Sequence, residues 1–409
     1  MHTRSSKKAL MRRCLTAAFV SCLYVVSGFL AAVALAKVAS RTVSAQQYSF
    51  EEVAAGLKHK DAATRLRAVQ ILKDADYQEA AAPIGDVLAD GDDRVQLAAI
   101  EAELSLFTLR PISRKKMVGL VIEQRTNSAA GDVAAEGQLA LKARLVPRSV
   151  LAGLVIALSD RNAQVRSEAI GLAALLAPIA CPVRPKADRS GCDPLGNALI
   201  ENINSREAPV RRAAMQALGR LQYPNAVQAL MDQLSYHQKG PDAQAALEGL
   251  AGIGHAASIS TLEDLLASSN TGVRTLAIEG LARANARDAL PMLQQMGQSE
   301  RSAGVLLALQ YATLKLGAPG SAPDHVVAAL RTDTLKPAAV RYLLDLAPVM
   351  APTLAMSLGD PDPEVRRLIA DILGFSGDAT VVPALAQAAR ASDPDVVLAV
   401  ERALERLRL

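Results

Sequence analysis

The chain offers few side chains at the spacings that catalysis or metal binding requires. Its five histidines are scattered, at His2, His59, His237, His255 and His325. None belongs to a His-Glu-x-x-His arrangement, which would place two imidazoles on one helix face to bind zinc. The sequence also has no Gly-x-Ser-x-Gly turn for a nucleophilic serine and no phosphate-binding glycine loop. We therefore predict a protein that is not an enzyme and that holds no metal or cofactor.

Two short matches to catalytic motifs have simpler explanations. Residues 252–257 fit the Gly-x-Gly-x-x-Ala dinucleotide fingerprint, but that fingerprint requires a preceding strand. Here a helical pattern precedes it, so we interpret it as a turn between helices. Residues 113–116 fit Ser-x-x-Lys, but the partner motifs of penicillin-binding enzymes are absent.

Four cysteines bear on the redox compartment. Cys14 and Cys22 lie in or beside an apolar N-terminal segment, whereas Cys181 and Cys192 bracket a basic loop with prolines. In an oxidising compartment this second pair is typical of a disulfide, which we predict. Free thiols are the alternative. A metal site is disfavoured because no further Cys or His stands near the pair.

A recurring sequence motif, which we call the Val-Arg phrase, marks the elements that position these residues. It is clearest as Asp-Pro-Asp-Pro-Glu-Val-Arg at residues 360–366, followed by Leu-Gly at 373–374. Val-Arg pairs return at residues 165, 210 and 273, and a related Asp-Pro-Asp-Val stands at 393–396. Val210 and Val396 are 186 residues apart, which in six steps gives a mean period of 31. A fixed period in this range predicts a stack of repeats rather than a globular enzyme fold.

Each repeat has the pattern of two helices. After each valine of the phrase, apolar residues recur at offsets 3, 4, 7 and 8, which is one stripe on a helix. Asp362 is a candidate N-cap with Pro363 at the first helical position, and Gly219 and Gly374 stand where a helix should stop. A second apolar segment then follows, at residues 226–234, 258–266, 289–296 and 380–388. One such hairpin cannot bury its own apolar face, so neighbouring hairpins must stack.

This pattern resembles the short HEAT repeats of the phycobilin lyases over about residues 50–409. The resemblance implies an all-α fold, a right-handed α-solenoid of about ten helical hairpins. It also implies that the Asp and Arg of the phrase form a structural ladder between repeats. The implied ladder residues are Asp160, Arg166, Arg211, Arg274, Arg341, Asp360 and Arg366. A recurring row of ligand-binding residues is the alternative interpretation of these positions.

The resemblance carries the fold and not the lyase activity. The chain begins with an export-type segment and has few aromatic residues, unlike the cytoplasmic proteins of pigment assembly. It also lacks the His-Glu pairs of the iron-binding HEAT-repeat hydroxylases.

The N-terminus predicts export. Residues 1–45 carry seven basic and no acidic side chains, and residues 15–36 form a run of 22 uncharged, mostly apolar residues. A basic start followed by an apolar run is the order of a secretory signal peptide, and this run is also long enough to span a bilayer. A cleaved signal and a retained inner-membrane anchor both remain open. Both predict a periplasmic or other extracytoplasmic location.

The remaining composition argues against nucleic-acid partners. Outside residues 1–45 the chain carries the other 38 of its 45 basic residues against all 41 acidic ones, a net charge of −3. A net charge of this sign offers no basic surface for binding duplex nucleic acid. Aromatic residues make up 3% of the chain and Trp is absent, whereas binding of single strands uses aromatic stacking platforms.

The predicted organisation is a signal or anchor at residues 1–45 and one solenoid at 46–409. An irregular insertion at 177–196 and a hinge at the Gly- and Pro-rich residues 317–323 interrupt the solenoid. We predict a scaffold for protein–protein interaction in the cell envelope, which binds through a concave row of second helices and the Cys181–Cys192 loop. A binder of small ligands or surface polymers is one alternative, and a lyase-type enzyme or enzyme accessory is another.

Overall fold

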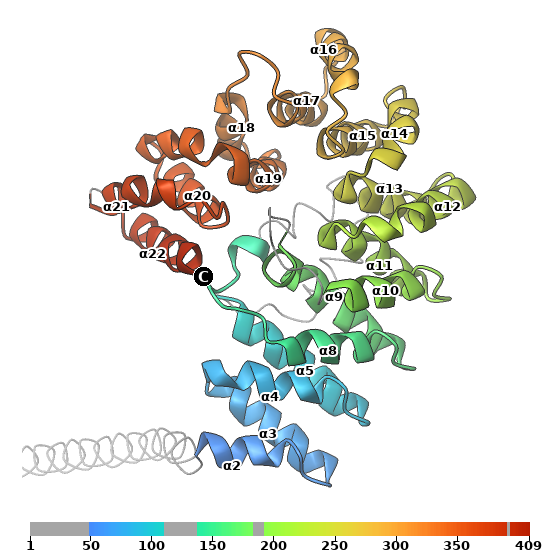
Figure 1. Cartoon of the computed structure of the whole chain (residues 1–409), viewed down its shortest axis with the longest axis vertical. Helices are drawn as coiled ribbons and strands as arrows, with labels where there is room; N and C mark the ends of the chain where they lie inside the picture. Colours follow the sequence, from blue (N-terminus) through green and yellow to red (C-terminus); the bar gives the residue numbers. More distant parts are fainter. Residues whose placement is uncertain (1–48, 110–136, 183–191, 391–392) are drawn as a thin grey trace, which may run out of the picture. The chain divides into compact units, whose positions relative to one another are not determined.

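The computed structural model describes residues 49–109, 137–182, 192–390 and 393–409 (Figure 1). The chain forms two compact units, Met1–Gly56 and Leu57–Leu409. The described part of the first unit is helix α2 (Phe50–Gly56), where Ser49 N donates to Glu52 Oε2 (2.9 Å) and Glu52 N donates to Ser49 Oγ (3.3 Å). These reciprocal bonds form a capping box that starts the helix. The predicted signal or anchor at residues 1–45 lies outside the described residues.

The described residues of the second unit form helices, with one isolated β-bridge between Thr108 and Leu141. The helices alternate between two rows (Figure 1). The inner row contains α3 (Ala62–Asp74), α5 (Asp93–Phe107), α9 (Ala163–Ala180), α11 (Ala208–Leu221), α13 (Pro241–Ile253), α15 (Thr271–Arg283), α17 (Ala303–Lys315), α19 (Lys336–Ala355), α20 (Pro363–Leu373) and α22 (Pro394–Arg408). The outer row contains α4 (Ala81–Val87), α8 (Arg148–Ala157), α10 (Asp193–Asn202), α12 (Val227–His237), α14 (Ile259–Leu265), α16 (Leu290–Ser299), α18 (Asp324–Ala328) and α21 (Val382–Arg390).

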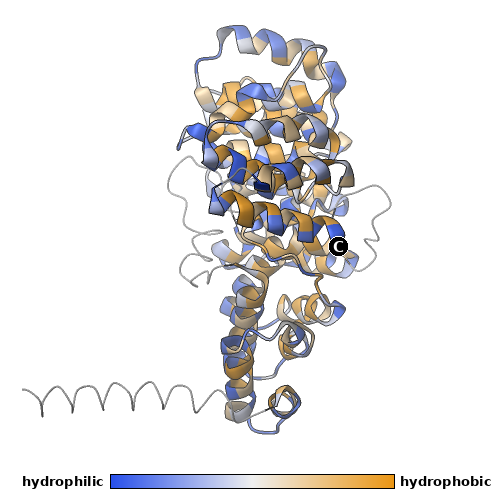
Figure 2. Cartoon of the chain, turned by 90° about the vertical axis from the view of Figure 1, so that its left-hand side faces the viewer, coloured by the Kyte–Doolittle hydropathy of each residue, from blue (hydrophilic) through white to orange (hydrophobic). Residues whose placement is uncertain are grey.

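This architecture confirms the predicted all-α solenoid of helical hairpins. The four second apolar segments coincide with α12, α14, α16 and α21. Asp362 caps α20, since its Oδ1 accepts a hydrogen bond from Glu364 N at 2.9 Å. The helices nearest the viewer in Figure 2 carry both hydrophobic and hydrophilic residues, as amphipathic helices in a stack do. The apolar stripes, such as Val365, Leu368 and Ile372, are buried between neighbouring repeats.

The prediction that the second helices line the concave side was wrong. Figure 1 places the helices that carry the Val-Arg phrase in the inner row. These helices contact one another closely, whereas most outer helices mainly contact the inner helix that follows them in the chain, as α12 contacts α13 and α21 contacts α22. Gly219 shows how the close approach is made: it lies inside α11 rather than at a helix stop, and an added Cβ would sit 2.9 Å from the Cα of Gly249 in α13. Small residues let the inner helices pack closely.

Two irregular steps of the repeat have structural causes. The step from Val340 to Val365 is 25 residues, shorter than the mean period, because α19 runs on for 20 residues through a kink at Met350 (φ −125°, ψ 16°), flanked by Pro348 and Pro352. The second half of α19 thereby replaces a separate outer helix before α20. The step from Val165 to Val210 is 45 residues, longer than the mean period, partly because α9 extends for 18 residues, to Ala180. The predicted insertion at 177–196 therefore shrinks to the residues between α9 and α10, most of which lie outside the described part of the chain.

Among the described residues, one stretch, Lys336–Gly359, is long and apolar enough to cross a membrane by length and composition alone. It comprises α19 and the turn that follows. Side chains along it, among them Val340, Leu343 and Leu354, are buried inside the repeat stack. Packing of the stack accounts for its apolar composition.

Candidate functional site

An arginine at the fourth residue of several inner helices joins two repeats. In α15, Arg274 Nη1 donates to the carbonyls of Ser268 (2.8 Å) and Ser269 (3.2 Å), in the loop before its own helix. Its Nη2 donates to Glu300 Oε2, 2.8 Å away, in the loop before α17. Because the guanidinium presents donors in a fixed fork, one side chain bonds both loops at once.

The same pair of contacts recurs along the inner row. The arginine–carboxylate pairs are Arg65 Nε to Asp90 Oδ2 (2.6 Å), Arg166 Nη2 to Glu207 Oε2 (2.9 Å) and Arg211 Nη2 to Asp242 Oδ2 (2.9 Å). Each of these arginines also donates through Nη1 to a carbonyl of its own loop. Sequence reasoning missed Arg65, because threonine stands before it in place of valine; the signal was the N-cap Asp61 four residues earlier.

The two aspartates of the predicted ladder lie in the loops that these arginines hold. Asp160 Oδ1 accepts from Asn162 N (2.7 Å), and its carbonyl accepts from Arg166 Nη1 (2.8 Å). Asp360 repeats this arrangement: its carbonyl accepts from Arg366 Nη1 at 2.7 Å. The Asp360 carboxylate also accepts from Arg331 Nη2 (2.6 Å to Oδ1) in the preceding repeat.

The ladder prediction for Arg341 was wrong. Arg341 is the sixth residue of α19, whereas the ladder arginines are the fourth residues of their helices. Two residues correspond to about 200° around a helix, so the side chain leaves on the opposite side. There its Nη1 bonds Glu279 Oε2 of α15, two inner helices away.

Arg341 belongs to a buried cluster of charged and tyrosine side chains, which we call the Glu279 cluster. Its members are Glu279 and Arg283 of α15, Tyr311 and Lys315 of α17, and Arg341, Tyr342 and Asp345 of α19. Glu279 is 1% exposed and accepts from Tyr342 Oη (2.6 Å) as well as from Arg341. Glu279 Oε2 also accepts a hydrogen bond from Arg283 Nη1, at 3.4 Å.

Asp345 is the second carboxylate of the Glu279 cluster. It accepts from Arg283 Nε (3.0 Å), from Lys315 Nζ (2.9 Å) and from Tyr311 Oη. The rings of Tyr311 and Tyr342 stack with centroids 4.4 Å apart at 13°, and both residues are fully buried. The cluster thus bonds α15 directly to α19 across α17, through residues 62 or more positions apart.

Electrostatics inside the cluster favour ion pairs and neutral tyrosines. Burial raises the pKa of Asp345, but Arg283 and Lys315 outweigh it and hold that pKa at about 2. Burial likewise raises the pKa of Glu279, and Arg341 and Arg283 bring it below its usual value. Burial raises the pKa of the Tyr311 and Tyr342 hydroxyls far above the usual value, so they remain neutral hydrogen-bond donors.

Asp345→Asn should remove an acid-sensitive part of the stability. The pKa of Asp345 falls from 3.8 to about 2 on folding, so its ionised form stabilises the fold above pH 4 and this stability is lost as the pH falls towards 2. We expect the variant to be about 2 kcal/mol less stable at pH 6, with the difference shrinking towards pH 2. Urea unfolding at pH 6, 4, 3 and 2 measures this. Asp264→Asn, at an exposed position of α14, should show no comparable loss.

A second charged cluster surrounds Asp371 of α20, which is 1% exposed. Its carboxylate accepts from Arg402 (Nε 3.0 Å, Nη2 2.8 Å) and from Arg406 Nη1 (3.2 Å), both of α22. Arg367 Nη1 lies 3.7 Å from the same carboxylate. Three guanidiniums therefore share one buried carboxylate, which we call the Asp371 cluster.

The predicted cysteine pair lies together in the structure. The Sγ atoms of Cys181 and Cys192 form a disulfide of 2.10 Å. Both cysteines are buried at the ends of α9 and α10. The loop that they enclose, residues 183–191, lies outside the described residues, as does the basic run at 114–116.

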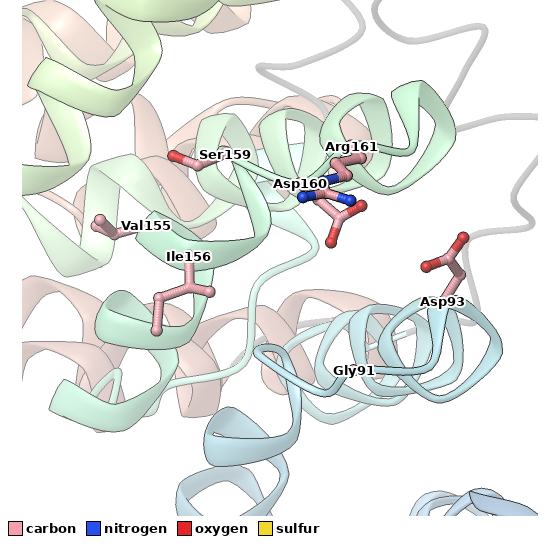
Figure 3. Close-up of a pocket in the computed structure, with 7 residues that line it drawn as sticks. All are labelled: Gly91, Asp93, Val155, Ile156, Ser159, Asp160 and Arg161. Atoms are coloured by element: carbon pink, nitrogen blue, oxygen red, sulfur yellow. The ribbon is translucent and has the colours of Figure 1, made fainter.

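A pocket of about 510 Å³ lies between the start of α5 and the end of α8 (Figure 3). Its lining residues are Gly91, Asp93, Val155, Ile156, Ser159, Asp160 and Arg161. No histidine or cysteine is among them, and Asp93 Oδ2 already accepts from Asn162 Nδ2 at 2.7 Å. Within the described parts of the chain, no group of three His, Cys, Asp or Glu side chains is placed to hold a metal ion.

The described tyrosines do not form an exposed platform. Tyr223, Tyr311 and Tyr342 are buried and Tyr77 is half-buried, while Tyr236 of α12 is 81% exposed and contacts the His237 ring. The three buried tyrosines therefore serve packing.

Two family models match the chain. The model for HEAT repeats matches residues 229–312 and 324–409, and the PBS lyase HEAT-like repeat matches residues 210–236. No curated protein matches in sequence. Among similar solved structures, an engineered protein is 17% identical, and the match covers 89% of this chain and 100% of that chain with a TM-score of 0.40. Human deoxyhypusine hydroxylase in complex with glycerol is 16% identical, with 64% of this chain and 96% of that chain covered and a TM-score of 0.29. Kap121p is 13% identical, with 88% of this chain and 41% of that chain covered and a TM-score of 0.35. The matched residues contain α12 to α16, most of α17 and all of α18 to α22, with the ladder contact of Arg274, the Asp371 cluster and the Glu279 cluster except Lys315. Residues 210–312 and 324–409 of the chain therefore consist of HEAT repeats.

Proposed function

We propose that the chain is a scaffold for protein–protein interaction that works outside the cytoplasm and holds a partner in the cell envelope. The observation that carries the proposal is the inner row of closely packed helices, which presents polar side chains from successive repeats. Gln216 of α11 and Gln244 of α13 show this: both bond Glu248, at 2.6 Å and 2.9 Å, and join two repeats into one surface. A surface built from successive repeats fits an extended partner.

Arginine and polar groups at this surface suit specific recognition. Arg367 and Arg402 are 30% and 23% exposed, so their guanidiniums are partly accessible although they bond Asp371. Arginine is enriched at the centres of protein interfaces because its fork binds carboxylates and carbonyls with defined geometry. The predicted polymer-binding alternative gains no support, since the buried tyrosines offer no stacking face.

A photo-crosslinker placed at residue 244 in living cells tests the scaffold. Gln244 is exposed on inner helix α13 and bonds Glu248 four residues on. Gln228 is its matched control, because it is exposed on outer helix α12 and bonds Asp232 four residues on, at 2.9 Å. We expect a reproducible adduct with a protein at position 244 and none at 228. Absence of an adduct at 244, or equal adducts at both positions, contradicts the proposed inner surface.

The location is tested separately through the disulfide. An exported chain should have Cys181 and Cys192 oxidised inside intact cells, since disulfides persist in oxidising compartments. Alkylation of acid-quenched cells with a thiol reagent of high mass measures the free thiols. Modification of the Cys181–Cys192 pair without prior reduction, with Cys14 and Cys22 replaced by serine, contradicts export.

A further inference from the structure

The last inner helix bonds a segment that lies 265 or more residues earlier in the chain. Arg406 of α22 donates from Nη2 to the carbonyls of Leu139 (3.0 Å) and Leu141 (2.6 Å). Its Nη1 bonds Asp371, and its guanidinium carbon lies 4.4 Å from the centre of the Phe375 ring. The side chain is 6% exposed, so these contacts are shielded from water.

The accepting segment is itself fixed to an early repeat. Leu109 N donates to Ala140 O and Lys142 N donates to Phe107 O, both at 2.8 Å. These bonds join residues 137–142 to the end of α5. Arg406 therefore links the last repeat to an early one through backbone carbonyls, which no side-chain pattern in the sequence encodes.

The chain between these two anchor points has a natural place to bend. Met350 interrupts the helical geometry of α19 (φ −125°, ψ 16°), between Pro348 and Pro352. Val349 and Met356, on either side of Met350, are 71% and 74% exposed, so the packing around the kink is open. The Glu279 cluster holds α19 before this kink, and Arg406 holds α22 after it.

We propose that Arg406 is a clasp: it holds α20 and α22 against residues 137–142, and its release lets these helices move about the kink at Met350, while the Glu279 cluster keeps the first part of α19 bonded to α15. A guanidinium suits this role because it stays charged at all working pH values and spans two carbonyls and a carboxylate at once. The clasp consists of the bonds of one side chain, so it opens without unfolding the repeats. The proposal does not depend on the identity or existence of a partner.

Hydrogen exchange of the full-length chain, followed by mass spectrometry, tests the clasp. Arg406→Ala should raise exchange at Leu109 and Lys142 by roughly tenfold, because their acceptor segment loses its anchor. Arg402→Ala is the matched control: it removes a neighbouring arginine from the same Asp371 but touches neither Leu139 nor Leu141. It should leave exchange in 137–142 unchanged.

A second readout follows the released segment. Proteinase K should cut within residues 142–147 several times faster in Arg406→Ala than in the parent chain or Arg402→Ala. If Arg406→Ala and Arg402→Ala change exchange and cleavage equally, both act through Asp371, and the clasp is overturned. Unchanged exchange in Arg406→Ala also overturns it. If Arg406→Ala loses its helices, Arg406→Lys replaces it as the test variant. The lysine keeps the positive charge beside Asp371 but lacks the forked guanidinium, so exchange at Leu109 and Lys142 should still rise. Exchange equal to that of the parent chain overturns the proposal.

Discussion

Glu279→Ala is expected to lower the free energy of unfolding by about 3–5 kcal/mol. The carboxylate is 1% exposed and is bonded by Arg283 and Arg341 and by the hydroxyl of Tyr342. Removing it leaves two guanidiniums and a buried phenol without this acceptor, and burial of uncompensated charge is costly. Because the bonds join α15 to α19, the loss should fall on the packing of these two repeats.

Urea unfolding of the parent and variants measures this effect. Glu201→Ala, at an exposed position of α10, is the matched control and should change stability by no more than about 0.5 kcal/mol. Glu279→Gln keeps an acceptor for Tyr342 and the side-chain volume, so it should lose less than alanine. If Glu279→Ala is as stable as Glu201→Ala, the cluster does not hold α15 to α19.

The repeat fold could be predicted from the sequence because its signals are local. An apolar stripe, an N-cap such as Asp362 and a proline at the next residue all lie within one turn or two of the same helix. The ladder could also be predicted where the arginine kept its distance from the helix start, as Arg274 does. Arg341 misled the prediction because its Val-Arg pair looks the same in sequence but begins two residues deeper in its helix.

The assignment of the inner row was missed although the sequence holds a signal for it. Helices on the inner side of a curved stack approach more closely, so they need small residues at their contacts. Gly219, Gly249 and Gly252 supply them in α11 and α13, where an added Cβ on Gly252 would lie 2.8 Å from Gly219. Reading the glycines as contact residues rather than helix stops would have placed the Val-Arg helices inside.

The charged clusters could not be predicted, for a physical reason. The bonds of the Glu279 cluster skip a repeat, as Arg283 does in reaching Asp345, so no fixed offset in the sequence marks them. The bonds of the Asp371 cluster join neighbouring inner helices, 31 and 35 residues apart, but one repeat length alone does not mark which charged residue is buried. Buried charges are tolerated only when their partners are in place, and the partners depend on the curvature of the whole stack. Arg406 is the extreme case, because its acceptors are backbone carbonyls, which every residue has.

Asp371→Ala should also cost about 3–5 kcal/mol, and its loss should appear in a different part of the stack. Asp371 accepts from Arg402 and Arg406 and lies near Arg367, so its removal gathers three like charges around a buried gap. Arg367 keeps Glu364, at 2.8 Å, whereas Arg402 loses both of its bonds to the carboxylate. Repulsion between Arg402 and Arg406 should then loosen α22 from α20.

Hydrogen exchange of Asp371→Ala should rise in α20 and α22 and stay unchanged in α11 and α13, while the control Asp264→Ala should leave exchange in both pairs of helices unchanged. Equal protection of α22 in Asp371→Ala and the parent chain would show that apolar packing alone, by residues such as Val396 and Val400, holds the last repeat.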